Sequence, residues 1–296
     1  MSDPLEFTGE RYTPECVREI RYEHVHRYVF ARELLSGLRV LDAACGEGYG
    51  SALLAQYAAH VTGVDVSSEA VEHATERYRA PNLEYRQADC LALPFPDDEF
   101  DCVISFETLE HLENHEGLMA EFRRVLRPSG FLLISTPDKA IYTDKEGNQN
   151  AFHIAELYRN EFESLLGRHF PVHRLWGQKL LFQSSIWSLQ AEPGVILHQE
   201  GTAGVSSAPS PEQDAVYLLA LCAEDEAFLP DLEFGLSLFD DAEQSVYEHY
   251  YHEIRKNMTA GGLLQERDRE IAELKAALAE PARGQASWWR RLLGKG

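Results

Sequence analysis

The sequence lacks any run of eighteen apolar residues, and this absence leaves no candidate for a membrane-spanning helix. Its opening stretch, MSDPLEFTGERYTPE, contains no apolar segment of the kind found in secretory signal peptides, so secretion is not expected. Cysteine is scarce as well, with 5 in the chain and no Cys-x-x-Cys pair, which argues against a zinc site of the usual spacing. We therefore expect a cytoplasmic protein whose thiols are reduced.

Basic residues are also few. The chain has 27 Lys and Arg but 49 Asp and Glu, and its formal net charge is −22 at pH 7. Nucleic acids are bound mainly through Lys and Arg contacts to phosphate, so this balance predicts no nucleic-acid partner. The rest of the composition, with 44% hydrophobic residues, is that of a globular protein. A chain of 296 residues can bury one substantial core and carry an appendage.

Short apolar runs alternate with amphipathic stretches along most of the chain. This alternation predicts a doubly wound α/β fold, in which a mostly parallel sheet carries helices on both faces. Strands are expected near residues 40–41, 60–65, 82–89, 100–108, 131–137, 173–185 and 215–223. Helices are expected at residues 17–36, 68–79, 115–127 and 155–170, and the second has a cap at Ser67 or Ser68.

The main domain is expected to cover residues 37–235, preceded by an N-terminal helical segment, residues 1–36. Within it, residues 191–214 are rich in Gly, Ser, Pro and Ala and predict a mobile loop. Residues 240–280 differ in character and predict C-terminal helices that break at Gly261 and Gly262.

The last of these helices has an apolar seam at heptad-like spacing, formed by Leu264, Ile271, Leu274 and Leu278. A seam of this length fits either a solvated surface helix or a short coiled coil that joins copies of the chain into a homo-oligomer. Residues 281–296 are basic and amphipathic, with two tryptophans and no acid. They predict either a peripheral membrane contact or a frayed tail.

The most informative segment is DAACGEGYG, residues 42–50, which follows the first predicted strand. Its glycines let the backbone pass close to a ligand, although dinucleotide-binding folds share the G-x-G pattern. The second strand ends at Asp65, 19 residues after Gly46, where an acid can hold two ribose hydroxyls. The third ends at Asp89 and Cys90, at the same edge of the sheet.

The elements follow one another in the order strand, DxxxGxG, helix, strand, Asp, helix, strand, Asp. This order resembles that of class I S-adenosylmethionine-dependent methyltransferases. The resemblance covers residues 38–136 through VLDAACGEGYGS, GVDVS, ADC, LPFPDDEFDCVISFETLEHL and VLRPSGFLLISTP. A nicotinamide enzyme is the weaker alternative, because Ser51 stands where the dinucleotide fingerprint has its third glycine. The resemblance implies a Rossmann-like, seven-stranded, mostly parallel sheet and S-adenosylmethionine as cofactor, with S-adenosylhomocysteine as product.

The resemblance also assigns cofactor-binding roles to individual positions. Asp42 would orient the methionine amino group, the loop from Ala44 through Gly46 to Gly48 would wrap the methionine, and Asp65 would hold the ribose. Four further positions would contact the adenine or lie near the methionine end: Val66, Asp89, Cys90 and Phe106.

The N-terminal FTGERYTPE and YEHVHRYVFA resemble the opening of bacterial methyltransferases of surface-glycan assembly, in which this segment is a lid over the cofactor. Arg11 and Tyr12 are the residues expected to contact the cofactor carboxylate, with Arg27 or Tyr28 as alternatives.

Two acids and a histidine gather in FETLEHLENH, where Glu107, Glu110 and His111 would share one face of a helix. The segment resembles small-RNA 2′-O-methyltransferases, whose acids and histidines hold a divalent metal, and O-methyltransferases of the ubiquinone pathway. His153 in NQNAFHIAEL is the expected later ligand, and Mg²⁺ or Mn²⁺ would suit the set. The alternatives are metal-free catalysis by His111 or His153 and a structural role, with Glu107 stabilising the helix N-terminus. His73 is expected on the solvated surface.

These features together predict an O-methyltransferase that acts on a sugar hydroxyl of a surface polysaccharide such as O-antigen, or on a lipid-linked glycan precursor. It would work in the bacterial cytoplasm or at the inner face of the membrane. One rival is a methyltransferase of a phenolic or quinone precursor, with an aromatic pocket drawn from Tyr142, Phe152, Trp176 and Phe182. The other is a non-catalytic scaffold that keeps the fold and is recruited to a membrane.

Overall fold

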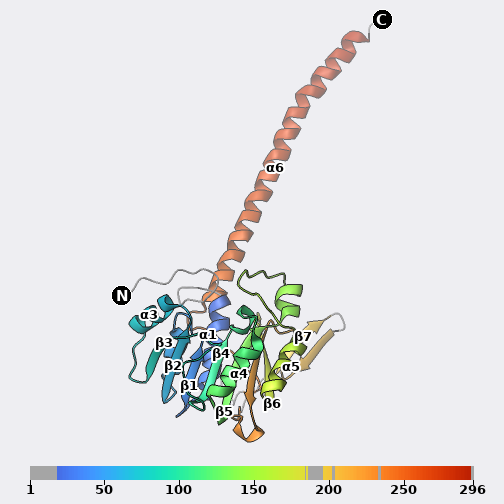
Figure 1. The fold of residues 1–296 in the computed structure, drawn as a ribbon. Helices are drawn as coiled ribbons and strands as arrows, with labels where there is room; N and C mark the ends of the chain where they lie inside the picture. Colours follow the sequence, from blue (N-terminus) through green and yellow to red (C-terminus); the bar gives the residue numbers. More distant parts are fainter. Residues whose placement is uncertain (1–18, 184, 186–195, 202–203, 233–234, 295–296) are drawn as a thin grey trace. The chain divides into compact units, whose positions relative to one another are not determined.

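The computed structural model describes residues 19–183, 185, 196–201, 204–232 and 235–294. The chain divides into two units, Met1–Phe239 and Asp240–Gly296. The first unit holds the seven-stranded sheet, and the second holds one long helix (Figure 1).

The first unit is built on a seven-stranded sheet with the order β3-β2-β1-β4-β5-β9-β6. Strands β3, β2, β1, β4 and β5 pair in parallel, and β9 runs antiparallel to both β5 and β6. The prediction of a mostly parallel, doubly wound sheet is therefore confirmed. The bounds are β1 Arg39–Ala43, β2 His60–Asp65, β3 Leu83–Gln87, β4 Phe100–Phe106, β5 Leu126–Pro137, β6 Val172–Gln178 and β9 Tyr217–Ala223.

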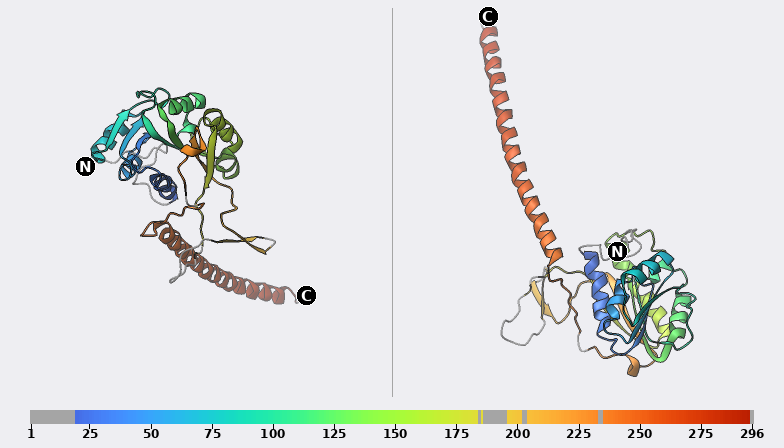
Figure 2. Two further views of the ribbon diagram at one scale, coloured as in Figure 1. Left: turned by 90° about the horizontal axis from the view of Figure 1, so that it is seen from below. Right: turned by 90° about the vertical axis from the view of Figure 1, so that its left-hand side faces the viewer.

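Helices cover both faces of this sheet (Figures 1 and 2). Successive strand residues point to opposite faces, so Val40 packs with the side chains of α1 and α2 while Leu41 packs with those of α4 and α5. Both faces are apolar, which is why the strands appear in the sequence as continuous apolar runs. The helices are α1 Glu19–Arg32, α2 Tyr49–Leu54, α3 Ser68–Arg77, α4 His115–Val125 and α5 Arg159–His169.

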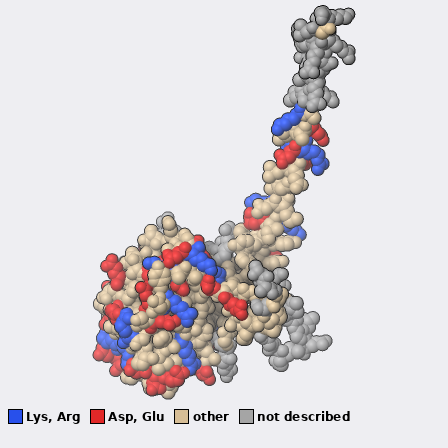
Figure 3. All heavy atoms as spheres, turned by 90° about the vertical axis from the view of Figure 1, so that its right-hand side faces the viewer, with Lys and Arg blue, Asp and Glu red and all other residues tan. Residues whose placement is uncertain are grey.

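Three short helical turns lie in the described part of the first unit, at Leu109–His111, Ala140–Lys145 and Glu226–Phe228. The first two follow β4 and β5 directly, so they lie at the carboxyl edge of the sheet, where open α/β sheets bind ligands. On the face drawn in Figure 3, acidic and basic side chains are intermingled over this unit.

The prediction of a loop at residues 191–214 is wrong in part. Leu197–Gly201 (β7) and Gly204–Ala208 (β8) pair as an antiparallel two-stranded sheet of their own. The Gly- and Ser-rich composition lowers strand propensity, but pairing satisfies the backbone groups of both segments at once.

The predicted break at Gly261 and Gly262 is also wrong, because a single helix, α6, runs from Ser245 to Leu293 and passes through both glycines. Glycine in a helix interior costs about 1 kcal/mol relative to alanine, but it leaves the hydrogen-bond ladder intact, so flanking helix-forming residues can carry the helix across it. The seam side chains Leu264, Ile271 and Leu274 are exposed. The coiled coil stays a prediction. No helix in the described part of the chain is long and apolar enough to cross a membrane.

Candidate active site

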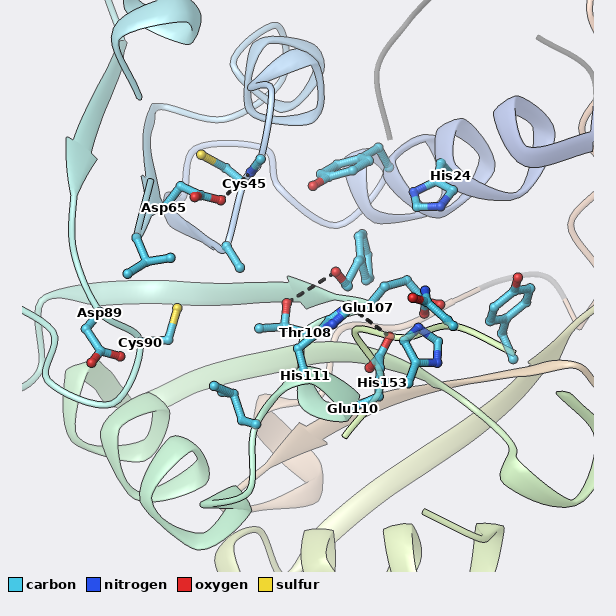
Figure 4. A pocket seen from close by; sticks show the side chains of 18 of the residues that line it. His24, Cys45, Asp65, Asp89, Cys90, Glu107, Thr108, Glu110, His111 and His153 are labelled. Carbon is cyan, nitrogen blue, oxygen red and sulfur yellow. Dashed lines mark hydrogen bonds and ion pairs between the residues drawn. The ribbon is translucent and has the colours of Figure 1, made fainter. Parts of the chain in front are cut away.

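A cavity of about 490 Å³ lies at the carboxyl edge of the sheet, where β1, β2 and β4 end. Figure 4 shows two groups of side chains at its opposite ends: Asp65, Cys45, Asp89 and Cys90 at one, and Glu107, Glu110, His111 and His153 at the other. The predicted cofactor residues on its wall are Ala44, Gly46, Asp65, Val66, Asp89, Cys90 and Phe106, and the predicted catalytic or metal residues there are Glu107, Glu110, His111 and His153.

The loop after β1 takes a left-handed backbone at Ala44, Gly46 and Gly48. A Cβ atom added at Gly48 would lie 2.6 Å from the Cβ of Ala74 on α3, so only glycine fits there. The loop is therefore folded tightly between β1 and α2, with its backbone turned toward the cavity at Ala44 and Gly46.

Asp65 fixes the second strand end against this loop. One of its carboxylate oxygens accepts a hydrogen bond from the Gly46 amide at 2.9 Å, and the other accepts one from the Ser67 amide at 2.9 Å. Ser67 also caps α3 through Ala70, as expected for one of the two serines predicted there. The carboxylate is held rigidly at the cavity wall, where a ligand hydroxyl can reach it.

Asp42 and Gly48 differ from the other described cofactor candidates, because neither lines the cavity. The Asp42 carboxylate is completely buried under the loop, where it accepts hydrogen bonds from the Ser51 hydroxyl at 2.6 Å and the Tyr28 hydroxyl at 3.2 Å. Burial raises the pKa of Asp42 to about 7. In this structure it supports the loop from beneath, whereas the resemblance implied direct contact with the methionine amino group.

The remaining cofactor candidates lie where β2, β3 and β4 end. Val66 is exposed, the Asp89 carboxylate caps the Leu91 amide at 2.8 Å, and Phe106 packs edge-on against Tyr28. Burial raises the pKa of the Cys90 thiol to about 12, so it is protonated and unreactive at neutral pH. Arg11 and Tyr12 lie outside the described residues.

Glu47, at the centre of the glycine loop, is a buried acid that sequence reasoning missed. Its side chain is fully buried and is 2.9 Å from His73 Nε2, 3.0 Å from Arg77 Nη1 and 2.8 Å from the Tyr78 hydroxyl. The prediction that His73 is solvated is wrong, because its ring is buried against Glu47. These contacts bind the loop to α3, and that helix begins just after Asp65.

At the far end of the cavity, Glu110, His111 and His153 converge. One potential ligand atom from each lies within 4.8 Å of the other two. His111 follows β4 and His153 follows β5, and the backbone amides of Ile154 and Ala155 bond to the Glu110 carbonyl, which joins the two segments.

The hydrogen bonds of the two histidines indicate which ring nitrogen carries the proton. His111 Nδ1 lies 2.9 Å from the Phe152 carbonyl oxygen, which can only accept, so Nδ1 carries the proton. His153 Nδ1 lies 2.6 Å from a Glu156 carboxylate oxygen in the same arrangement. In each ring Nε2 is therefore the basic nitrogen, the atom able to accept a proton or bind a cation.

Glu110 is completely buried, and burial, reinforced by the nearby Glu107, raises its pKa well above the ordinary value. One carboxylate oxygen accepts from the Thr136 hydroxyl at 3.1 Å. The other has no hydrogen-bond partner among the described residues and lies 4.0 Å from His111 Nε2. A buried acceptor in this condition is costly unless a proton or a cation supplies the missing interaction.

Glu107 does not join this cluster, although the sequence predicts a shared helical face. Its backbone is left-handed, with φ 52°, and the helical turn begins only at Leu109. Its carboxylate accepts from the Ser135 hydroxyl at 2.7 Å and forms an ion pair of 3.0 Å with Arg27 on α1. Arg27 is thus committed to Glu107 and Gln178 and does not line the cavity.

Other residues on the wall carry little sequence signal: His24, Tyr49, Asn150 and Tyr217. Tyr217 is the first residue of the apolar strand β9, and this position is the only sequence signal that its ring lies at the edge of the sheet. The four aromatics considered for a phenolic pocket do not gather in one place. Tyr142 lines this cavity, Trp176 lines a different one, and neither cavity is lined by Phe152 or Phe182.

Comparison with known proteins finds relatives of this chain. Residues 41–134 match the family described as "Methyltransferase domain". A protein of Mycolicibacterium smegmatis named a probable S-adenosylmethionine-dependent methyltransferase is 33% identical over 234 residues, which are 77% of this chain and 90% of that protein.

A Mycobacterium tuberculosis protein with the same description is 39% identical over 165 residues, or 55% of this chain and 60% of that protein. Among solved structures, the PH0226 protein of Pyrococcus horikoshii is similar in fold, with a TM-score of 0.50 and 23% identity over 72% of this chain and 94% of that one.

Proposed function

The chain belongs to the class I S-adenosylmethionine-dependent methyltransferases, and on that premise we propose that it transfers the methyl group to a hydroxyl oxygen. The observation that carries the proposal is the convergence of Glu110, His111 and His153 at the end of the cavity away from Asp65 and Asp89. S-adenosylmethionine supplies a methyl group on a sulfonium, which is already a good leaving group. The protein therefore has to place the acceptor oxygen in line and to remove its proton.

The residues present fit the cofactor. The left-handed loop at Ala44 and Gly46 and the carboxylate of Asp65 form a fixed cradle at the strand ends. The proton of the acceptor hydroxyl can pass to Nε2 of His111 or His153, the ring nitrogen left basic by the hydrogen bond at Nδ1. The new C–O bond replaces the C–S bond, and the proton passes to an imidazole.

The same three residues also fit a divalent cation. Two imidazole nitrogens and a carboxylate are a ligand set that Mn²⁺ accepts readily and that Mg²⁺, which prefers oxygen, accepts less well. A cation would satisfy the buried Glu110 oxygen that has no partner among the described residues. It would also lower the pKa of a bound hydroxyl. Since Glu107 is engaged by Arg27, the proposed set has three protein ligands and not the four expected from the sequence.

We further propose a sugar hydroxyl as the acceptor, in a surface polysaccharide or a glycan precursor. The support is the polar character of the far end, where Asn150, Tyr142 and Tyr217 join the cluster, together with the excess of acid along the chain. A phenolic acceptor is the alternative: three of the four aromatics considered for it lie away from the reaction cavity, while Tyr142 lines it together with Tyr28, Tyr49, Phe106 and Tyr217.

Calorimetric titration of Mn²⁺ and Mg²⁺ into protein saturated with S-adenosylhomocysteine tests the cluster. Binding is expected in the wild type and should be lost in Glu110→Gln, His111→Ala and His153→Ala. The matched controls are Glu113→Gln, an exposed acid three residues further on, and His252→Ala on α6. No binding by the wild type would refute the metal.

The next test would be a methyl-transfer assay with hydroxyl-bearing acceptors and no added metal, with the product detected by mass spectrometry. Its result in the wild type and the two histidine variants would test His111 and His153 as bases. Failure of the wild type to bind S-adenosylhomocysteine would instead favour a non-catalytic scaffold.

A further inference from the structure

A second cavity, of about 840 Å³, lies in the first unit beside the reaction cavity. Neighbouring residues face opposite ways: Glu23 lines the second cavity and His24 the first, and the same holds for Ile141 and Tyr142. Figure 4 shows His24 on the reaction side. The N-terminal half of α1 and the helical turn that follows β5 thus form a wall that separates the two spaces.

Both cavities lie along the same edge of the sheet. The second is bordered by Asp138, directly after β5, by Gln178, at the end of β6, and by Ala215, just before the antiparallel β9. In the strand register, Gln178 pairs with Tyr217, which lines the reaction cavity. The two cavities therefore adjoin at this edge, and a ligand that occupies both would cross the Gln178–Tyr217 pair.

The wall between them is built around Arg27, which is only 1% exposed. Its guanidinium donates to the Gln178 side chain at 3.0 Å and lies 4.7 Å from the centre of the Tyr217 ring. Its Nη2 atom is buried without a hydrogen-bond partner among the described residues. Buried donors in this condition usually mark a place where a water molecule or a ligand oxygen belongs.

The lining of the second cavity narrows the class of ligand. The acids Glu23 and Asp138 would be desolvated by an apolar chain, which offers them no hydrogen bond. A phosphate would be repelled by the same acids. The two basic side chains on the lining, Arg159 and Lys179, are already paired with Glu163 at 2.7 Å and with Glu146 at 2.8 Å.

With apolar chains and phosphates set aside, a neutral, polyhydroxylated ligand fits the other side chains of the lining. The amides Gln183 and Gln213 can both donate to and accept from hydroxyls, and the acids can accept from them. Trp176 and Phe239 add aromatic surface for the apolar faces of a ring. Sites that bind small molecules combine apolar walls with a few convergent polar groups in this way.

We propose that the second cavity binds the non-reacting sugar units of a glycan acceptor, while the hydroxyl to be methylated lies at Glu110, His111 and His153. This inference rests on the proposed function of the reaction cavity. The second cavity then decides which glycan is accepted and how far along it the enzyme acts.

The test measures binding of a panel of neutral linear trisaccharides, based on glucose, mannose and galactose, to the full chain saturated with S-adenosylhomocysteine. Gln213→Trp puts an indole on the lining of the second cavity, at an exposed position that tolerates it. Glu212→Trp adds the same ring one residue away, at an exposed position that does not line the cavity. At least one trisaccharide should bind, and Gln213→Trp should weaken that binding tenfold or more while Glu212→Trp leaves it unchanged.

The affinity for S-adenosylhomocysteine should be the same in all three proteins. The inference is overturned if no trisaccharide binds, if both variants bind the trisaccharide equally well, or if dodecanoate competes for the site, since the last result would mean an apolar ligand. Loss of S-adenosylhomocysteine binding by the wild type would refute the proposed function instead, so the two failures are distinguishable.

Discussion

Replacing Asp42 with asparagine should make the protein more stable at neutral and alkaline pH while weakening its hold on the cofactor. The carboxyl is completely buried, and its pKa is raised from 3.8 to about 7, with burial as the largest cause. Between these two values the folded protein keeps a proton that the unfolded chain has lost. Stability therefore falls as pH rises through this window, and the full cost is present above it.

The size of the effect follows from the width of that window. At about 1.4 kcal/mol for each pH interval of one, the cost of ionising Asp42 reaches about 4 kcal/mol above pH 7, of which about 3 kcal/mol accumulates between pH 5 and pH 8. Asparagine has no charge to bury and can still accept from Ser51. The melting temperature of the variant, relative to wild type, should rise by roughly 5 to 10 °C between those two pH values.

Differential scanning calorimetry of the unliganded proteins across this pH range measures the difference directly. Asp97→Asn, which removes an exposed acid, is the matched control and should follow the wild type at every pH. The variant should also bind S-adenosylhomocysteine more weakly by tenfold or more, because asparagine has one acceptor oxygen where the carboxyl has two, and the loop loses the support of the hydrogen bond from Tyr28. Parallel melting curves for wild type and Asp42→Asn at all pH values would refute the reasoning.

Three further changes test the packing around the site. Gly48→Ala should destabilise the protein by about 2 to 3 kcal/mol in urea unfolding, because its Cβ would collide with α3 and its φ is 93°. Gly37→Ala, with φ 78° and open space around it, should cost only about 1 kcal/mol, and equal losses would contradict the argument. Glu47→Gln should weaken binding of S-adenosylhomocysteine about tenfold and speed amide exchange in residues 44–50, because it loosens the loop from α3. An unchanged exchange rate would show that the loop is held by other contacts. Arg27→Met should cost about 3 to 5 kcal/mol by leaving the Glu107 carboxylate unpaired, and adding Glu107→Gln should recover part of that loss. No recovery in the double variant would mean that the ion pair is not the cause.

The parts of this fold that could be predicted are those specified by neighbouring residues. The buried strands appear as apolar runs, and the loop from Ala44 to Gly48 follows from glycines that local packing requires. Asp65 stands at a strand end, a position that parallel pairing fixes at the edge of the sheet. The spacing of apolar residues and the positions of glycine and proline are enough to predict such features.

The features that sequence reasoning missed depend on partners distant in the chain. Glu107 is drawn away from the histidine cluster by Arg27, which lies 80 residues earlier. His73 is buried because Glu47 is turned toward it from a loop 26 residues away. Neither pairing leaves a periodic signal, since the partners belong to different elements. The continuous α6 was missed because two adjacent glycines weaken a helix without ending it.

The two ends of the reaction cavity come from separate stretches of the chain. Residues 44–46, 65–66 and 88–91 supply the end with Asp65 and Asp89, while residues 106–112, 142–153 and Tyr217 supply the other end. On the proposed function, changes in the second group are expected to alter the acceptor while leaving the methyl donor site intact. The same proposal predicts that exchanging the segments that follow β4 and β5, in evolution or in chimeric enzymes, gives new acceptor specificities.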